Sequence, residues 1–387
     1  MRQTKLDVWR RLAVGFTTVT LALAGPAVGL ATPAAAQDDR LPRHELDALL
    51  DEMVSAGLPG AVGLARRGSD TWRGASGLAV IDPQREMRPT DRWGVGSLTK
   101  TAVATVVLQL AGEGRLGLDD SVERWLPGLV PNGGNITLRE LLNHSSGLFN
   151  YTDDPRILAP YLAGDFGFVW TPLQLVGVAM SHPPLFPPGD HHSYSNTGYI
   201  LLGLVVEKVT GTSLGTQLRR RIFDPLDLQG TSFPTTQQRV TGSLAHGYYI
   251  GVGPNGGLLD ATEVSPSWAW AAGAMVSTSD DLARFLRALL RGRLLPPNLL
   301  NQMLTTIPGG SPGLRYGLGI AALDTPCGTL WGHDGGEQYQ TWALNSRDAD
   351  RQVVMMVNAN DGASVPLLVL DQVARAHCLL AETPALR

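Results

Sequence analysis

Segments with the pattern of β-strands lie near both ends of this 387-residue chain. Residues 61–80 have the pattern of a hairpin that turns at Gly68-Ser69-Asp70. Strand patterns return only in the last fifth of the chain, at residues 316–323, 340–346 and 352–358. Because strands must pair with other strands, the two ends are expected to meet in one sheet.

The middle of the chain has the pattern of helices. From about residue 102 to residue 238, apolar segments at helical spacing alternate with loops rich in proline and glycine. Further helices are expected within residues 45–57 and from about Val365 to Leu380. The predicted fold class is α+β, an antiparallel sheet flanked by helices with an inserted helical domain. We assign residues 37–100 and 260–387 to the domain that contains the sheet, and residues 101–259 to the inserted, mainly helical domain.

The first 36 residues resemble an export signal. Four basic residues precede an apolar run, and Ala34-Ala35-Ala36 fits a cleavage site. The alternative is a retained membrane anchor, but the run is short and contains Gly25 and Pro26. We therefore expect a secreted protein without a stable membrane anchor.

The charge of the chain argues against nucleic acid as a partner. The formal net charge is −4, and removal of residues 1–36, with their net charge of +3, would make it −7. We expect a monomer that acts on small molecules.

Cys327 and Cys378 are the only cysteines, and an exported protein meets an oxidising compartment. We predict that they form a disulfide; two separately buried thiols are the alternative. Two cysteines are too few for a thiolate zinc site, and the adjacent His191 and His192 lack further ligands at metal-binding spacing. No metal or cofactor is expected.

One lysine stands out in a chain whose other cations are mostly arginine. Lysine occurs only at positions 5, 100 and 208, and Lys100 follows Ser97 by three residues at the start of an apolar helix. Residues three apart share a helix face, and a desolvated lysine can be neutral, which arginine cannot. Ser97 is therefore a candidate nucleophile and Lys100 its candidate base. An exposed helix start with a solvated lysine is the alternative.

Two further motifs follow in the chain. "YSN" provides Tyr194, Ser195 and Asn196 before a helix, and "HDG" provides His333, Asp334 and Gly335 on an expected strand. Each is a weak signal alone, and their order and wide spacing carry the argument.

These motifs resemble those of the SxxK serine acyltransferases, the superfamily of penicillin-binding proteins, serine β-lactamases and related esterases. Within it, the likeness is strongest to secreted D-alanyl-D-alanine carboxypeptidases. It extends over nearly the whole chain after residue 36 and includes "HSYSNTGYILLGLVVEKVTG" and "SWAWAAGAMVSTSDDLARF". The resemblance implies a β-lactamase/DD-peptidase-like fold and a bridge between the two cysteines.

The resemblance also implies a role for each motif residue. Tyr194 would shuttle a proton to the leaving group, Asn196 would donate a hydrogen bond to a substrate amide, and His333, where most relatives have lysine, would supply positive charge or relay a proton. The N–H groups of Ser97 and Gly336 would bind the oxyanion. The remaining candidates for the substrate groove are Phe149, Thr152, Trp268 and Gly335, although Thr152 and Phe149 also fit simple loop geometry. One of Trp268 and Trp270 is expected in the core.

The chain departs from the carboxypeptidases where they bind a substrate carboxylate. The arginine and two threonines used there are replaced by Ala321, Asp334 and Gly336, and Glu337 adds another negative charge. Like charges repel strongly when desolvated, so we expect substrates with a neutral or cationic group at that end.

Three functions are compatible with this pattern. The first is an enzyme that forms an acyl-enzyme on Ser97 with D-amino-acid peptides such as peptidoglycan stem peptides. The second is an esterase or β-lactam hydrolase with the same machinery. The third is a non-catalytic module that binds penicillin or peptidoglycan, against which the complete set of Ser97, Lys100 and Tyr194 argues.

Overall fold

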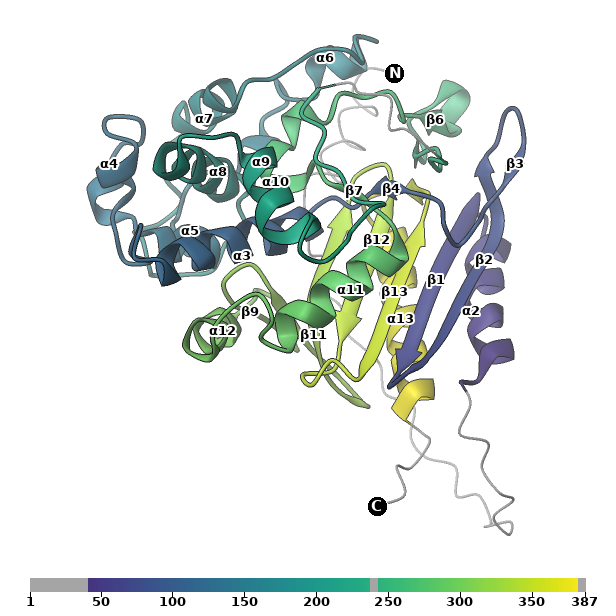
Figure 1. Cartoon of the computed structure of the whole chain (residues 1–387). Helices are drawn as coiled ribbons and strands as arrows, with labels where there is room; N and C mark the ends of the chain where they lie inside the picture. The colour runs from purple at the N-terminus through teal and green to yellow at the C-terminus, as the bar shows by residue number, and fades with distance from the viewer. Residues whose placement is uncertain (1–40, 237–242, 382–387) are drawn as a thin grey trace.

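The computed structural model describes residues 41–236 and 243–381, so the expected signal peptide lies outside the described residues. Within them, the two ends of the chain meet in one antiparallel sheet (Figure 1). β1 and β13 form the junction, from Ala61 opposite Val357 to Arg67 opposite Arg351. The α+β class is confirmed. In order across the sheet, the strands are β3 (Arg85–Glu86), β2 (Asp70–Val80), β1 (Gly60–Arg67), β13 (Arg351–Val357), β12 (Gln340–Asn345), β11 (Gly328–Gly336), β10 (Ala321–Thr325), β9 (Leu314–Tyr316) and β8 (Ile307–Pro308).

Both faces of the central strands are buried, which explains their nearly continuous apolar sequences. Val62 and Leu64 of β1 pack on one side, whereas Ala61 and Ala65 pack on the other. The predicted β1–β2 hairpin is confirmed, and Gly68 supplies the left-handed backbone (φ +59°) that its two-residue turn needs.

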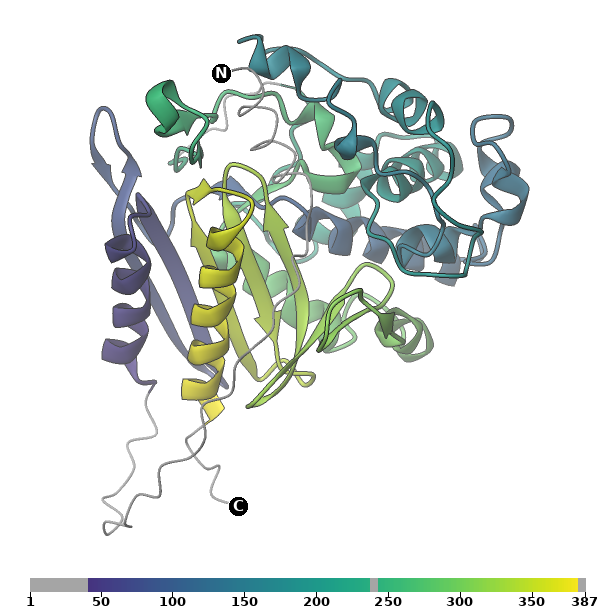
Figure 2. The ribbon, with the colours of Figure 1, turned by 180° about the vertical axis from the view of Figure 1, so that it is seen from behind.

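Two helices cover one face of the sheet, α2 (Arg43–Ser55) and α13 (Ser364–Ala381), and both agree with the predicted helices (Figure 2). By length and composition, α13 is the one described helix that could cross a membrane; here it packs on the sheet with 39% of its residues buried. A disulfide joins Cys327, in the turn between β10 and β11, to Cys378 in α13, as predicted.

The other face carries α11 (Ser279–Leu290) and the large helical region (Figure 1). The sequence specifies these helices locally: in α7 (Pro172–Met180), Thr171 and Gln174 form a capping box at the start of the helix, with Pro172 at the first helical position.

The remaining helices and short strands complete the fold. The other helices are α3 (Leu98–Gly112), α4 (Val122–Trp125), α5 (Leu138–Leu142), α6 (Ala159–Leu162), α8 (Asn196–Thr210), α9 (Leu214–Leu218), α10 (Trp270–Gly273) and α12 (Pro297–Leu304). The short strands are β4 (Trp93–Gly94) with β7 (Val276–Ser277), and β14 (Ala359–Asn360) with β5 (Tyr248–Tyr249) and β6 (Leu259–Asp260).

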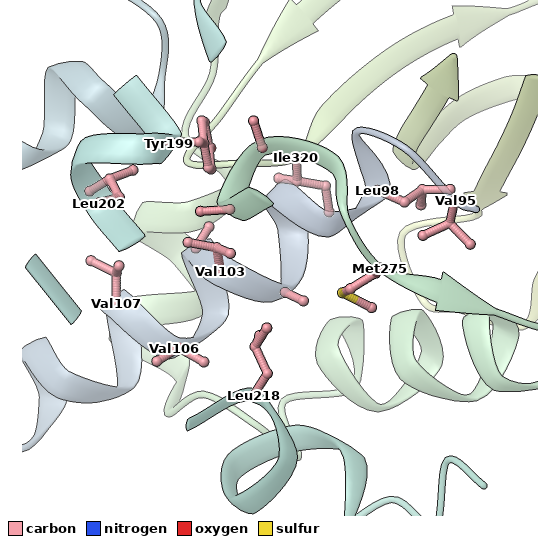
Figure 3. Close-up of a cluster of buried hydrophobic side chains, with 14 of the residues drawn as sticks. Val95, Leu98, Val103, Val106, Val107, Tyr199, Leu202, Leu218, Met275 and Ile320 are labelled. Atoms are coloured by element: carbon pink, nitrogen blue, oxygen red, sulfur yellow. The ribbon is translucent and has the colours of Figure 1, made fainter. Parts of the chain in front are cut away.

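Helix α3 positions Ser97 and Lys100, the first two residues of the candidate site. It is buried on nearly all sides, as expected for a helix inside a protein. Figure 3 shows Val103, Val106 and Val107 of α3 among side chains from several other elements, including Tyr199, Leu202, Leu218, Met275 and Ile320. Burial of a valine side chain contributes roughly 1.5–3 kcal/mol. The predicted boundary between residues 100 and 101 falls inside α3, so the division into two domains stays a prediction.

Candidate active site

Ser97 stands at the N-terminal end of α3, and its hydroxyl group does not cap the helix. Instead, Ser97 Oγ lies 2.8 Å from Lys100 Nζ and 2.8 Å from Tyr194 Oη. The structure therefore brings together the two residues on one turn of α3 with a third that comes from the loop before α8. The positive end of the helix dipole also favours negative charge at Ser97.

Lys100 is completely buried, yet its amino group has three neighbours of suitable geometry. Besides Ser97, these are Asn196 Oδ1 at 2.7 Å and the carbonyl oxygen of Ala272 at 2.7 Å. Burial lowers the pKa of Lys100 to about 7, against the opposing effect of the negative charges of Asp334 and Glu337. A neutral amine has two N–H donors for Asn196 and Ala272, and its lone pair is then free to accept the proton of Ser97.

Tyr194 donates its hydroxyl hydrogen to Ser97 Oγ. Burial, together with the charge of Asp334, raises the pKa of Tyr194 well above its ordinary value. The phenol therefore keeps its proton near neutral pH. In this state Tyr194 can act as an acid rather than as the base toward Ser97.

Both polar atoms of the Asn196 side chain, Oδ1 and Nδ2, contact other residues of the protein. Its Nδ2 group donates to Asn150 Oδ1 and to Thr152 Oγ1, each at 3.2 Å. Its backbone N–H donates to Asn150 Oδ1 at 3.0 Å. Thr152 therefore supports Asn196 from a buried position, and donation from Asn196 to a substrate amide stays a prediction.

The end of β11 passes very close to the loop before Ser97. A methyl group at Gly335 would lie 1.9 Å from the carbonyl oxygen of Val95 and 3.0 Å from the nitrogen of Ser97. Gly96 has a left-handed backbone (φ +54°), and a methyl group there would lie 3.1 Å from the nitrogen of Gly336. Glycine at these positions lets the backbones of Ser97 and Gly336 approach each other.

The position of His333 bears on one of its two predicted roles, direct proton relay; the supply of positive charge stays a prediction. Its ring is buried, Nδ1 donates to the carbonyl oxygen of Asp334 at 2.6 Å, and Nε2 lies 2.7 Å from Tyr316 Oη. Both ring nitrogens are thus engaged away from Ser97, so direct proton relay to the serine needs a different ring position. The Asp334 carboxylate also lies 3.3 Å from Nδ1, and its charge affects the pKa values of Lys100 and Tyr194.

The side chain of Phe149 does not join these hydrogen bonds. It stacks on His182, with ring centroids 3.9 Å apart, and lines a pocket of about 410 Å³ whose walls include none of Ser97, Lys100, Tyr194 or Asn196. Trp268 contributes its carbonyl oxygen, which accepts a hydrogen bond from Tyr151 at 2.6 Å. Its half-buried ring packs against the main core, and Trp270 is buried there.

Four groups in or around the site were not singled out in the sequence. Ala272, Asn150 and Tyr316 contact Lys100, Asn196 and His333. His144 is buried with a left-handed backbone (φ +62°), accepts a hydrogen bond at Nδ1 from the N–H of Ser195 and lies 4.2 Å from Tyr194 between ring centroids. Its place in "LLNHSSGLFN" is the sequence signal that could have pointed to it.

Two known proteins match most of this chain in sequence. Penicillin-binding protein 4* of Bacillus subtilis (strain 168) is 26% identical over 338 residues, which cover 84% of this chain and 72% of the relative. Esterase EstB of Burkholderia gladioli is 29% identical over 374 residues, which cover 84% of this chain and 92% of the relative.

Solved structures of similar fold include two amide-hydrolysing enzymes. A D-stereospecific amidohydrolase from Streptomyces sp. superposes with a TM-score of 0.79 and 41% identity, covering 85% of this chain and 98% of that chain. D-amino acid amidase from Ochrobactrum anthropi SV3 superposes with a TM-score of 0.75 and 30% identity, covering 85% of this chain and 98% of that chain. The sequence model of the Beta-lactamase family matches residues 46–376. Together with the fold and the Ser97–Lys100–Tyr194 geometry, this match establishes that the chain belongs to the beta-lactamase family and is a serine hydrolase.

Proposed function

We propose that this protein is a secreted hydrolase that cleaves amide or ester bonds at the carbonyl group of D-amino-acid residues whose leaving group carries no free carboxylate. The observation that carries the proposal is the negative charge beside the reacting groups: Asp334 acts on both Lys100 and Tyr194. A substrate carboxylate placed there would be repelled. The 41% identity to a D-stereospecific amidohydrolase supports the choice of D-configured amides.

The chemistry follows from the three central residues. Neutral Lys100 accepts the proton of Ser97 as Ser97 Oγ attacks the carbonyl carbon, and the N–H groups of Ser97 and Gly336 stabilise the oxyanion. Tyr194 then donates its proton to the leaving nitrogen or oxygen, and the proton that Lys100 took from Ser97 replaces the one lost by Tyr194. The C–N or C–O bond breaks and leaves an ester on Ser97, which water hydrolyses with the same groups reversed in role.

Export rests on the sequence of residues 1–36 alone. Cleavage after Ala36 would leave Gln37 as the first residue. N-terminal sequencing of protein recovered from the culture medium of an expressing bacterium tests this part of the proposal.

Specificity is tested with D-alanyl-D-alanine and its C-terminal amide, both of which have a free amino group. We expect the wild type to hydrolyse the amide with a kcat/KM at least about tenfold higher than the free acid, because like charges placed against each other in a binding site repel strongly. Asp334→Thr should shift the preference toward the acid. Asp324→Thr is the control, since it removes the same charge from a carboxylate that is paired with Arg315 on the surface.

A wild type that prefers the free acid would refute the proposal and restore the carboxypeptidase alternative. An ester substrate and a chromogenic β-lactam in the same panel distinguish the esterase and β-lactam hydrolase alternatives. Absence of turnover on every substrate would favour the non-catalytic binding module.

A further inference from the structure

Glu337 directly follows β11 and has a fixed backbone. Its N–H donates to the carbonyl oxygen of Tyr339 at 2.9 Å, and its own carbonyl oxygen accepts from Asn360 Nδ2 at 2.9 Å. It lies two residues after Gly335, the strand residue that touches the loop before Ser97. These hydrogen bonds therefore fix the backbone of Glu337, and with it the origin of its side chain, close to the catalytic groups.

The carboxylate of Glu337 lies against α10. A methyl group at Gly273 would be only 2.6 Å from Glu337 Oε1, and Gly273 follows Ala272, whose carbonyl oxygen contacts Lys100. Glu337 also lines a small pocket of about 90 Å³, together with Gly273 and Glu263. Ser97, Lys100 and Tyr194 do not line this pocket, and its link to the site is Gly273, which follows Ala272. The charges of Glu337 and Lys100 act on each other, which puts this carboxylate within electrostatic reach of the reacting centre.

Within residues 41–236 and 243–381, the carboxylate of Glu337 has no hydrogen-bond or ion-pair partner. Asp334, the other acidic residue beside Lys100, contacts the ring of His333. Burial raises the pKa of Glu337 to about 8, although the charge of Lys100 opposes this effect. A half-buried carboxylate without a cation beside it is costly to ionise, and a ligand that supplies the cation would remove that cost.

We propose that Glu337 binds the free α-ammonium group of a D-aminoacyl substrate. The inference rests on the proposed function and adds the group on the acyl side that the site selects. A primary ammonium is compact and offers three N–H donors, which suits a small pocket with a carboxylate wall. An N-acetylated substrate would instead place a neutral amide against the carboxylate and leave it without a counter-charge.

The two carboxylates would then act on different parts of the substrate. Glu337 would contact the acyl side through the ammonium group, whereas Asp334 would act on the leaving-group side. Because both negative charges affect Lys100, replacement of Asp334 is a matched control for the general loss of one charge near the base.

The test uses the boronic acid analogue of D-alanine and its N-acetyl derivative as inhibitors of p-nitrophenyl butyrate hydrolysis. A boronic acid adds to Ser97 without cleavage of an amide bond, so the measurement does not require that any amide is a substrate. The wild type should bind the free amine at least about tenfold more tightly than the N-acetyl compound. In Glu337→Gln this ratio of inhibition constants should fall to about one, through weaker binding of the free amine alone.

Asp334→Asn should keep the wild-type ratio, and Glu337→Asp, which retains the charge on a shorter side chain, should keep part of it. The inference is overturned if the wild type does not prefer the free amine, or if Glu337→Gln weakens both inhibitors equally. If Glu337→Gln does not fold, the wild-type comparison can still overturn the inference, and Glu337→Asp then tests whether this residue sets the ratio. If the ratio behaves as expected while no D-aminoacyl amide is cleaved, the proposed function fails and the ammonium site stands.

Discussion

The amino group of Lys100 lies 2.8 Å from the hydroxyl oxygen of Ser97 and is held there by two further acceptors, Asn196 Oδ1 and the carbonyl oxygen of Ala272. Those acceptors can satisfy both N–H groups of a neutral amine. The only position left for its lone pair is toward Ser97. This arrangement makes the assignment of nucleophile and base open to direct test.

A fluorescent fluorophosphonate, which has no carboxylate, should label the protein covalently at Ser97. Ser97→Ala should lose labelling, and its esterase kcat should fall by about a thousandfold or more, because Ser97 Oγ is the hydroxyl oxygen that contacts both Lys100 and Tyr194. Gel fluorescence and mass spectrometry of the labelled peptide measure the result. Ser193→Ala, in the loop before Tyr194, is the control and should label normally; labelling of Ser97→Ala at wild-type level would identify another nucleophile.

Lys100→Arg should retain the positive charge and lose most of the acylation rate, by about two to four orders of magnitude. Arginine does not release its proton near neutral pH, and its larger head group cannot fit the three contacts of a buried ammonium. The rate of the acylation burst with a p-nitrophenyl ester measures this effect. Lys208→Arg, in the last turn of α8, serves as the control. Rapid acylation by Lys100→Arg would mean that charge alone is required.

The kcat/KM of ester hydrolysis should rise with pH and level off above a midpoint of about 7. The direction follows from the lowered pKa of Lys100: below the midpoint the amine is protonated and cannot accept the proton of Ser97, so the rate falls about tenfold per pH unit. In Asp334→Asn the midpoint should move to lower pH, because the negative charge that raises the pKa of Lys100 has been removed. An unchanged midpoint in this variant would show that the pH dependence does not come from the ionisation of Lys100.

Removal of the disulfide should lower stability without abolishing the site. Cys327 and Cys378 are 51 positions apart, and closing a loop of this length contributes about 4 kcal/mol in the chain-entropy model. We expect the double Cys→Ser variant to have a lower thermal midpoint of unfolding, and wild type treated with a reductant to shift in the same direction. Calorimetry measures both. Equal midpoints for the variant and the oxidised wild type would show that the bridge does not constrain the unfolded chain.

The sequence by itself determined the features that depend on neighbours along the chain. The i, i+3 spacing puts Ser97 and Lys100 on one turn of α3, and the turn residues after β1 specify the first hairpin. Apolar patterns located α2, α13, β12 and β13, because each buries a face of fixed periodicity. The single strand predicted at residues 316–323 is wrong: residues 317–320 form a turn that separates β9 from β10.

Only the tertiary structure decided which distant groups surround those residues. Ala272 and Asn196 reach Lys100 from positions far along the chain, and the ring of His333 turns to Tyr316 rather than to Ser97. Phe149 lines a separate pocket, although it is close in sequence to Asn150 and Thr152. Side-chain direction and desolvation depend on the packing of elements that come from all parts of the chain, and no local pattern encodes that packing. The lowered pKa of Lys100 depends on it as well, since complete burial of this lysine requires α3, α8 and α10 to close around it.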